Sequence, residues 1–167
     1  MKKDPKIKQK GDCKNCILTT QLFPRKRLKA KKKIKRQLDA LAYDYCQQVY
    51  QNPNIHDYPS VVVVACYKSG KGGFVKKQSS SFVKSSYSRL IPMMNAIGGL
   101  GNQAKKHVSC DYCNNTIGCC AEQHAGEMVL RSNLYYKPTD VVFSQSLRPR
   151  TGEPKEYCCI CKCLFKL

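Results

Sequence analysis

Two short stretches of the sequence carry residues whose types and spacing can do chemistry. Residues 119–122 read Cys-Cys-Ala-Glu at the start of a predicted helix, and residues 158–161 read Cys-Cys-Ile-Cys near the C-terminus. Together they supply soft thiol ligands and one carboxylate. Three protein ligands leave a zinc ion its fourth position for water, and an acid beside the metal can move protons there. The two stretches therefore predict a zinc site with an open coordination position.

The same stretches resemble the signature of the zinc-dependent cytidine deaminase-like superfamily. That family carries [His or Cys]-x-Glu at one helix start and Cys-x-x-Cys at the next. Its Cys-Ala-Glu form occurs in nucleoside deaminases and in bacterial toxin-type deaminases, so the resemblance includes toxin-like members. Here Cys-Ala-Glu stands at 120–122 and Cys-x-x-Cys at 158–161, preceded by Tyr157 where the family usually has proline. The resemblance implies that the zinc ligands are Cys120, Cys158 and Cys161 and that the catalytic acid/base is Glu122.

The resemblance also implies a reaction. It is hydrolytic deamination of a nucleobase, with cytosine to uracil as the leading expectation and adenine as the alternative. The substrate would be single-stranded nucleic acid, a nucleoside or a nucleotide. Glu122 would take a proton from zinc-activated water and pass it to the base and the leaving ammonia. Asn102, in a glycine-rich segment before the first motif, is a candidate substrate-binding residue.

Hydrophobic periodicity and turn residues predict the elements that position these residues. We expect an amphipathic helix at 37–51, hairpin strands at 60–67 and 74–78, a short helix near 90–97, a helix at 118–133, a strand at 140–147 and a last short helix from about 158. This order resembles that of the superfamily over about residues 37–167. It implies an α/β protein with a three-layer α-β-α, cytidine deaminase-like fold, a mixed sheet and a short C-terminal end.

Other ligand sets remain open at this stage. Cys159 with Cys163, one helical turn apart, is an alternative to the pair above. His124 lies four residues after Cys120, on the same face of the predicted helix, and could also bind a metal. His124 with Glu127 does not have the family spacing, because two residues separate them.

Two more Cys-x-x-Cys pairs, Cys13/Cys16 and Cys110/Cys113, could form a second zinc site. The chain has twelve cysteines and shows no secretory signal, which favours metal binding over disulfides and an intracellular location, cytoplasmic or nuclear. The competing function is therefore a non-enzymatic, cysteine-rich zinc-binding module that binds nucleic acid. Its zinc ions would each be closed by four thiolates.

Charge is concentrated at the N-terminus. The net charge of the 167 residues is +19, and residues 1–36 hold fifteen Lys and Arg against two acids. We expect 1–36 to be a basic, flexible arm and 37–167 to be one deaminase-like domain. A concentration of positive charge of this kind attracts polyanions, and nucleic acid is the expected partner. A solvated arm without a partner would have the same composition. The longest apolar run, residues 61–66, is too short to span a membrane.

Overall fold

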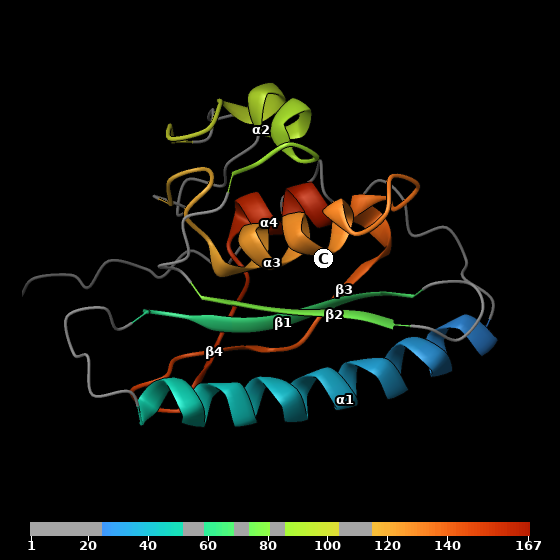
Figure 1. Ribbon diagram of the computed structural model, residues 1–167, viewed down its shortest axis with the longest axis vertical. Coiled ribbons are helices and arrows are strands. Elements are labelled where there is room, and N and C mark those ends of the chain that lie inside the picture. The colour runs from blue at the N-terminus through green and yellow to red at the C-terminus, as the bar shows by residue number, and fades with distance from the viewer. Residues whose placement is uncertain (1–24, 52–58, 69–73, 81–85, 104–114) are drawn as a thin grey trace, which may run out of the picture.

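The computed structural model of the protein describes residues 25–51, 59–68, 74–80, 86–103 and 115–167 (Figure 1). Its helices are α1 (Arg25–Tyr50), α2 (Ile91–Ile97), α3 (Ala121–Arg131) and α4 (Cys159–Phe165), with one 3-10 turn, η3 (Pro138–Asp140). Its strands are β1 (Val62–Lys68), β2 (Phe74–Ser80), β3 (Val141–Phe143), β4 (Ser146–Leu147) and β5 (Pro154–Lys155). Among these helices none combines the length and the apolar character that a membrane crossing requires.

The strands form one sheet in the order β2-β1-β4-β5, and β3 also pairs with β1. β1 and β2 form the expected hairpin, in register from Val62 opposite Ser80 to Lys68 opposite Phe74. Every pairing between the described strands is antiparallel, so the prediction of a mixed sheet is wrong for this part of the chain. The reason is connectivity: β1–β2 and β4–β5 are hairpins, and the chain returns from α3 running opposite to β1.

Helices cover both faces of this sheet, because the side chains of β1 and of Val61 before it alternate between two apolar clusters. Those of Val62, Val64 and Cys66 pack against α1. Those of Val61, Val63 and Ala65 lie on the α3 side, in an apolar cluster that also includes residues of α2 and α4. Figure 1 shows α1 along one side of the sheet and α3 with α4 on the other. The apolar run at 61–66 is thus a strand buried on both faces, and the expected helix–sheet–helix layering is present.

Helix α1 is longer than expected. Periodicity indicated a start at residue 37, whereas the helix begins at Arg25 and includes the basic block. Lys, Arg and Ala are strong helix formers, and the buried side chain of Ile34 extends the apolar face that Leu38 continues. The boundary at 36/37 therefore falls inside α1, and residues 1–24 of the expected arm lie outside the described residues.

The glycine-rich segment after α2 is hydrogen-bonded to the segment that leads into α3. The Gly101 N–H donates to the Ile117 carbonyl over 2.9 Å, and the Ile117 N–H donates to the Asn102 carbonyl over 2.9 Å. Gly118 has a φ of +94°, and a Cβ there would lie 2.2 Å from Leu100 Cδ1. The positive φ favours glycine at this position, two residues before Cys120.

The expected strand at 140–147 is divided into β3 and β4 by a one-residue bulge. Ala65 pairs with Phe143, so an uninterrupted register would place Ser146 opposite Val62; Leu147 is there instead. The bulge reverses the alternation of side chains after it. Leu147 consequently packs with the α1 cluster, and Ser146 points to the α3 side of the sheet.

Ser144 stabilises this bulge with its side chain. Its N–H donates to the Val64 carbonyl over 2.8 Å, and its hydroxyl accepts from the Val64 N–H over 2.9 Å. The hydroxyl thus replaces a backbone carbonyl in the ladder. The backbone N–H of Gln145 donates to Asp39 Oδ1 over 2.6 Å, and this hydrogen bond connects the bulge to α1.

Candidate metal centre

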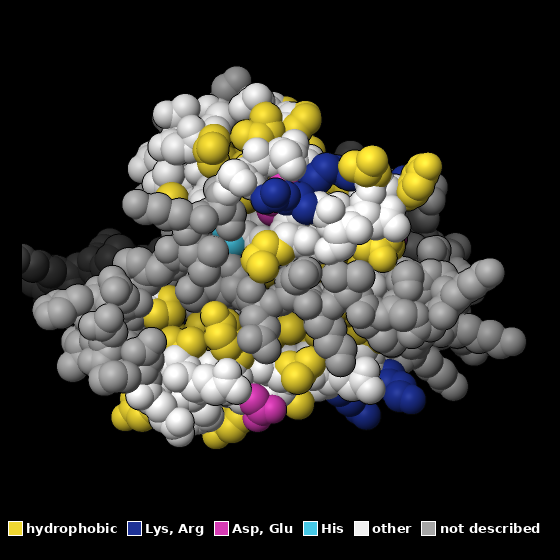
Figure 2. All heavy atoms as spheres, viewed as in Figure 1, with side chains coloured by type: hydrophobic (Ala, Val, Ile, Leu, Met, Phe, Trp, Pro, Cys, Tyr) yellow, Lys and Arg dark blue, Asp and Glu magenta, His cyan; other side chains and the backbone are white. Residues whose placement is uncertain are grey.

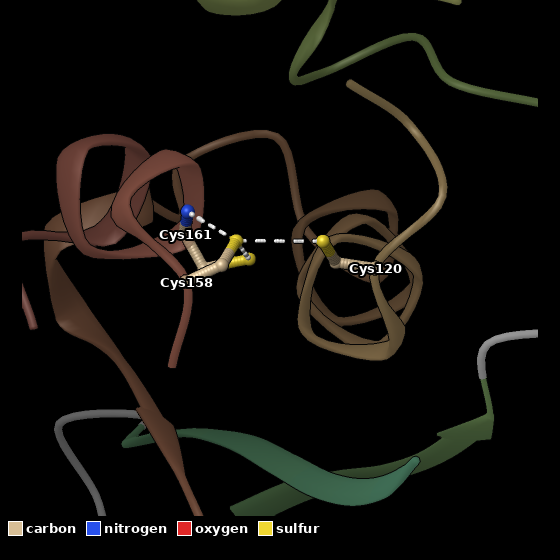
Figure 3. A group of neighbouring side chains, drawn as sticks. All are labelled: Cys120, Cys158 and Cys161. Atoms are coloured by element: carbon tan, nitrogen blue, oxygen red, sulfur yellow. Dashed lines mark hydrogen bonds between the residues drawn. The ribbon is translucent and has the colours of Figure 1, made fainter. Parts of the chain in front are cut away.

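Three thiols converge where α3 and α4 begin (Figure 3). Cys120 is the N-cap residue of α3, Cys158 is the N-cap residue of α4, and Cys161 lies in the first turn of α4. The Cys120 Sγ is 3.4 Å from the Cys158 Sγ, which is 3.5 Å from the Cys161 Sγ. All three sulfurs lie within 4.8 Å of one another, and in the part of the chain that the structure describes they are the one such group of possible metal ligands.

The two helices approach closely because α3 has a glycine at the crossing. A Cβ on Gly126 would lie 2.4 Å from Phe165 Cζ, so the Phe165 ring of α4 occupies the space that any other side chain would fill. The ring also packs edge-on against Phe143, with centroids 4.7 Å apart. This contact holds the two helix N-termini at a separation from which their thiols can share one ion.

Without a metal ion the three thiols share their protons unequally. Hydrogen bonding with the Cys120 and Cys161 thiols lowers the pKa of Cys158 to about 2. Hydrogen bonding with Cys158 raises the pKa of Cys120, and burial raises the pKa of Cys161. The Cys161 N–H also points at the Cys158 Sγ, 3.5 Å away, as expected at a helix N-terminus. The Cys158 thiolate is thus stabilised by its neighbours, and a bound cation would favour ionisation of the other two thiols.

The sulfur positions fit a small divalent ion. Tetrahedral zinc with Zn–S bonds of about 2.3 Å separates its ligand sulfurs by about 3.8 Å. Two of the observed separations, 3.4 and 3.5 Å, lie slightly below that value, and the third is no more than 4.8 Å. The thiols can therefore hold a metal ion with little rearrangement, and Cys159 and Cys163, the alternative pair, lie outside the group.

A buried carboxylate lies beside the thiols. Glu122, in the first turn of α3, is only 5% exposed. The Ser146 hydroxyl donates to its Oε1 over 2.6 Å, and the Cys161 thiol is 3.6 Å from its Oε2. Burial raises the pKa of Glu122. One carboxylate oxygen is thus held by the bulged strand, and the other faces the thiols.

A cavity of about 70 Å³ reaches this group from the surface. Cys120, Cys158 and Glu122 form part of its wall, and Lys155 and Glu156 of the β5 region line it as well. Two of the three thiols and the carboxylate therefore border a space that opens to the surface, whereas Cys161 lies behind them.

Gln123 ties the approach to α3 to the thiol group. Its side chain is fully buried, its Oε1 accepts from the Gly118 N–H over 2.5 Å, and its Nε2 lies 3.7 Å from the Cys161 Sγ. A backbone N–H can only donate, so the amide oxygen must meet Gly118 and the nitrogen must face the sulfur. An N–H directed at a ligand sulfur orients it and offsets its negative charge.

We expect Gln123→Leu to weaken metal binding by about 10–100-fold, the usual effect of removing a partner of a metal ligand. Competition with a chelator measures the affinity without any assay of activity. Gln48→Leu, at an exposed position of α1, is the matched control and should bind the metal like the parent. Equal affinity of the two variants would contradict the role of Gln123.

The His124/Glu127 pair does not contribute to the thiol group, because both side chains have other partners. The His124 Nδ1 is 2.9 Å from the Tyr87 hydroxyl, which donates to the Gly118 carbonyl, and burial lowers the pKa of His124. The fully buried Glu127 carboxylate accepts from the Ser88 N–H and hydroxyl and from the N–H groups of residues 89 and 90, over 2.7–2.9 Å. Both residues hold the segment before α2 onto α3.

Glu127→Gln should lower the free energy of unfolding by about 2–3 kcal/mol, because the amide nitrogen cannot accept a hydrogen bond and would leave buried donors unsatisfied. Urea denaturation checks this. Asp44→Asn, at an exposed position of α1, should change stability by less than about 0.5 kcal/mol. A Glu127→Gln protein as stable as that control would show that the four hydrogen bonds contribute nothing.

The remaining predicted site residues lie elsewhere. Asn102 is exposed, its side chain donates to the Gly98 carbonyl over 3.2 Å, and its role in substrate binding stays a prediction. The pairs Cys13/Cys16 and Cys110/Cys113 lie outside the described residues. Sequence reasoning did not identify Gln123 or Ser146. The motif draws attention to residues 120 and 122, and no residue pattern marks a bulge that turns one serine toward a carboxylate.

Comparison with protein-family models, with curated proteins and with solved structures found no match for this chain. Its class is therefore defined by its own fold and site. It is an α/β protein with an antiparallel sheet between helices and a three-cysteine group that can hold a metal ion where two helices begin.

Proposed function

We propose that the protein is a zinc-dependent hydrolytic deaminase of a nucleobase, with cytosine as the leading substrate. One observation carries the proposal: a buried carboxylate lies beside three thiols, and it borders a cavity together with two of them, Cys120 and Cys158. A structural zinc site is normally closed by four ligands, whereas a catalytic one has three and keeps a position for water. The exposed neighbour Cys119 is not part of the group, so a fourth thiolate is not supplied from the adjacent position.

The donor set fits zinc, because thiolates at helix N-termini are the soft ligands that this ion prefers. When bound in such a site, zinc supplies a Lewis acid and lowers the pKa of a bound water toward neutrality. The ligands would be Cys120, Cys158 and Cys161.

Glu122 would perform the proton transfers. Its Oε1 is held by Ser146, so its Oε2 on the thiol side can accept a proton and return it. Burial raises the pKa of this carboxyl group, which brings its proton affinity closer to that of the groups between which it must carry the proton. In a cytosine, the proton would go first to the ring nitrogen and then to the leaving amino group.

The fold supports the finer assignment to a cytidine deaminase-like architecture. The chain runs as helix α1, hairpin β1–β2, short helix α2, helix α3 with Cys-Ala-Glu, strands β3 to β5 and helix α4 with Cys-x-x-Cys. Apart from α2 and β5, that is the element order of the superfamily the two motifs resemble. Tyr157, in place of the usual proline, donates its hydroxyl hydrogen bond to the Ser144 carbonyl and so connects the second motif to the bulge.

The test is ammonia release and cytosine-to-uracil conversion by the zinc-loaded protein. Single-stranded DNA, single-stranded RNA, cytidine and cytidine monophosphate are offered in parallel, with the adenine counterparts beside them. Turnover of at least one cytosine substrate is expected. Stoichiometric zinc without turnover of any substrate would overturn the enzyme and favour the alternative, a zinc-binding module that binds nucleic acid. Turnover of the adenine substrates alone would show that the substrate base is adenine and not cytosine.

A further inference from the structure

The N-terminal half of α1 is a dense cationic surface. Nine of the twelve residues from Arg25 to Arg36 are Lys or Arg, and none is acidic. A helix holds them in fixed positions over a length of about 18 Å. Of the side chains described there, Lys32, Lys33, Lys35 and Arg36 are exposed, whereas Ile34 is buried against the sheet. Figure 2 shows Lys or Arg side chains at the lower right, where Figure 1 places α1, and another group of them near the upper centre, away from α1.

These charges work against the helix that carries them. The first turn of a helix favours acidic residues, and α1 has none there. Like charges four residues apart, such as Lys32 and Arg36, repel each other along one side of the helix. Among the described residues one cation of this block has a carboxylate partner, Lys35 with Asp39 at 3.3 Å. The block therefore lowers the stability of the free protein, which a binding role would explain.

The surface is separate from the thiol group. α1 packs on one face of the sheet through Ile34, Leu38, Ala42 and Cys46, whereas α3 and α4 lie on the other face (Figure 1). A ligand on the solvent side of α1 therefore does not occupy the cavity beside Glu122.

We propose that the solvent face of α1 binds the phosphodiester backbone of a nucleic acid and tethers the protein to it independently of the metal site. A row of cations on one rigid helix matches the regular negative charge of such a backbone, and counterion release drives the association. Tyr43 and Tyr50, which are 54% and 57% exposed, lie seven and fourteen residues after Arg36, on the same side of the helix. They offer aromatic surfaces on which bases of a single strand can stack.

The packing of α1 favours a nucleic acid over a lipid surface. An amphipathic helix binds a bilayer by inserting its apolar face. In α1 the apolar face is already buried against β1 and β4, at Ile34, Leu38, Ala42 and Cys46. The cations could still attract anionic headgroups, so the experiment includes vesicles.

The experiment compares the full chain with a variant carrying Lys32→Gln, Lys33→Gln and Arg36→Gln. Binding to a labelled single-stranded oligonucleotide is followed by fluorescence anisotropy at several salt concentrations. The variant should bind at least about tenfold more weakly at low salt, and its slope of log K against log salt should be shallower by about two. Its zinc content should equal that of the parent, and its urea midpoint should be equal or higher because repulsion has been removed.

The control removes the same charge elsewhere, through Lys137→Gln, Arg148→Gln and Lys166→Gln, at exposed positions outside α1. It should keep most of the affinity. Equal losses in the two variants would overturn the proposal, because the effect would then belong to net charge. So would oligonucleotide binding that the α1 changes leave intact while they abolish binding to phosphatidylserine vesicles. None of these measurements needs turnover, so a failure here is distinct from a failure of the proposed enzyme.

Discussion

Glu122→Gln should lower the rate of deamination by about 10²–10⁴-fold while the metal content stays unchanged. Glutamine has nearly the same shape, and its amide oxygen can still accept from the Ser146 hydroxyl. It cannot take up and return a proton, and general acid/base catalysis is worth about that factor. Single-turnover assays of uracil formation, with zinc measured on the same sample, separate the chemical step from metal loss.

The matched control for this change is Glu153→Gln, an exposed glutamate in the turn between β4 and β5. It should retain the full rate. A Glu122→Gln protein that works within tenfold of the control would mean that another group moves the proton. A Glu122→Gln protein without zinc would instead assign the carboxylate to metal binding.

Cys158→Ser should lower zinc affinity by more than about a hundredfold. Loss of a ligand exceeds the 10–100-fold effect of losing a ligand's hydrogen-bond partner. Cys158 is also the thiol that contacts both of the others, at 3.4 Å from the Cys120 Sγ and 3.5 Å from the Cys161 Sγ, and these contacts lower its pKa. Chelator competition gives the affinity. Thermal unfolding with and without zinc gives a second measure, because an ion bound at a hundred times its Kd stabilises by about 2.7 kcal/mol.

Cys119→Ser is the control, because Cys119 adjoins Cys120 in sequence but lies outside the thiol group. Its zinc affinity and its zinc-dependent shift in unfolding temperature should equal those of the parent. If Cys119→Ser loses zinc and Cys158→Ser does not, the ligand assignment is wrong and the second motif contributes different thiols.

The elements around the site were largely predictable because each one buries apolar side chains at a regular spacing in the sequence. The alternating contacts of Val61 to Cys66 require an extended strand between two layers, and the spacing of Leu38, Ala42 and Cys46 requires a helix on one of them. The thiols were predictable for a similar reason, since a Cys-x-x-Cys at a helix start brings Cys158 and Cys161 together locally.

The parts that were not predicted depend on contacts distant in sequence. The start of α1 at Arg25 was missed because a block of cations has no apolar period. The bulge at Ser144 was missed because one extra residue in a strand leaves the composition unchanged, although it decides which face Ser146 and Leu147 occupy. The mixed sheet implied by the family resemblance requires some parallel pairs of strands. It was wrong for the described strands because residue types do not encode strand direction.

The positions of the three thiols along the chain would make a bound metal ion a reversible cross-link. Cys120 and Cys158 are separated by 38 residues, which include β3, the bulge and the β4–β5 hairpin. Bringing the two ends of a loop of that length together on folding costs conformational entropy. An ion bound to both ends offsets this cost. Zinc should therefore protect the whole segment from β3 to α4 against proteolysis as one cooperative unit. Chelation should then expose that segment to a protease before the hairpin β1–β2.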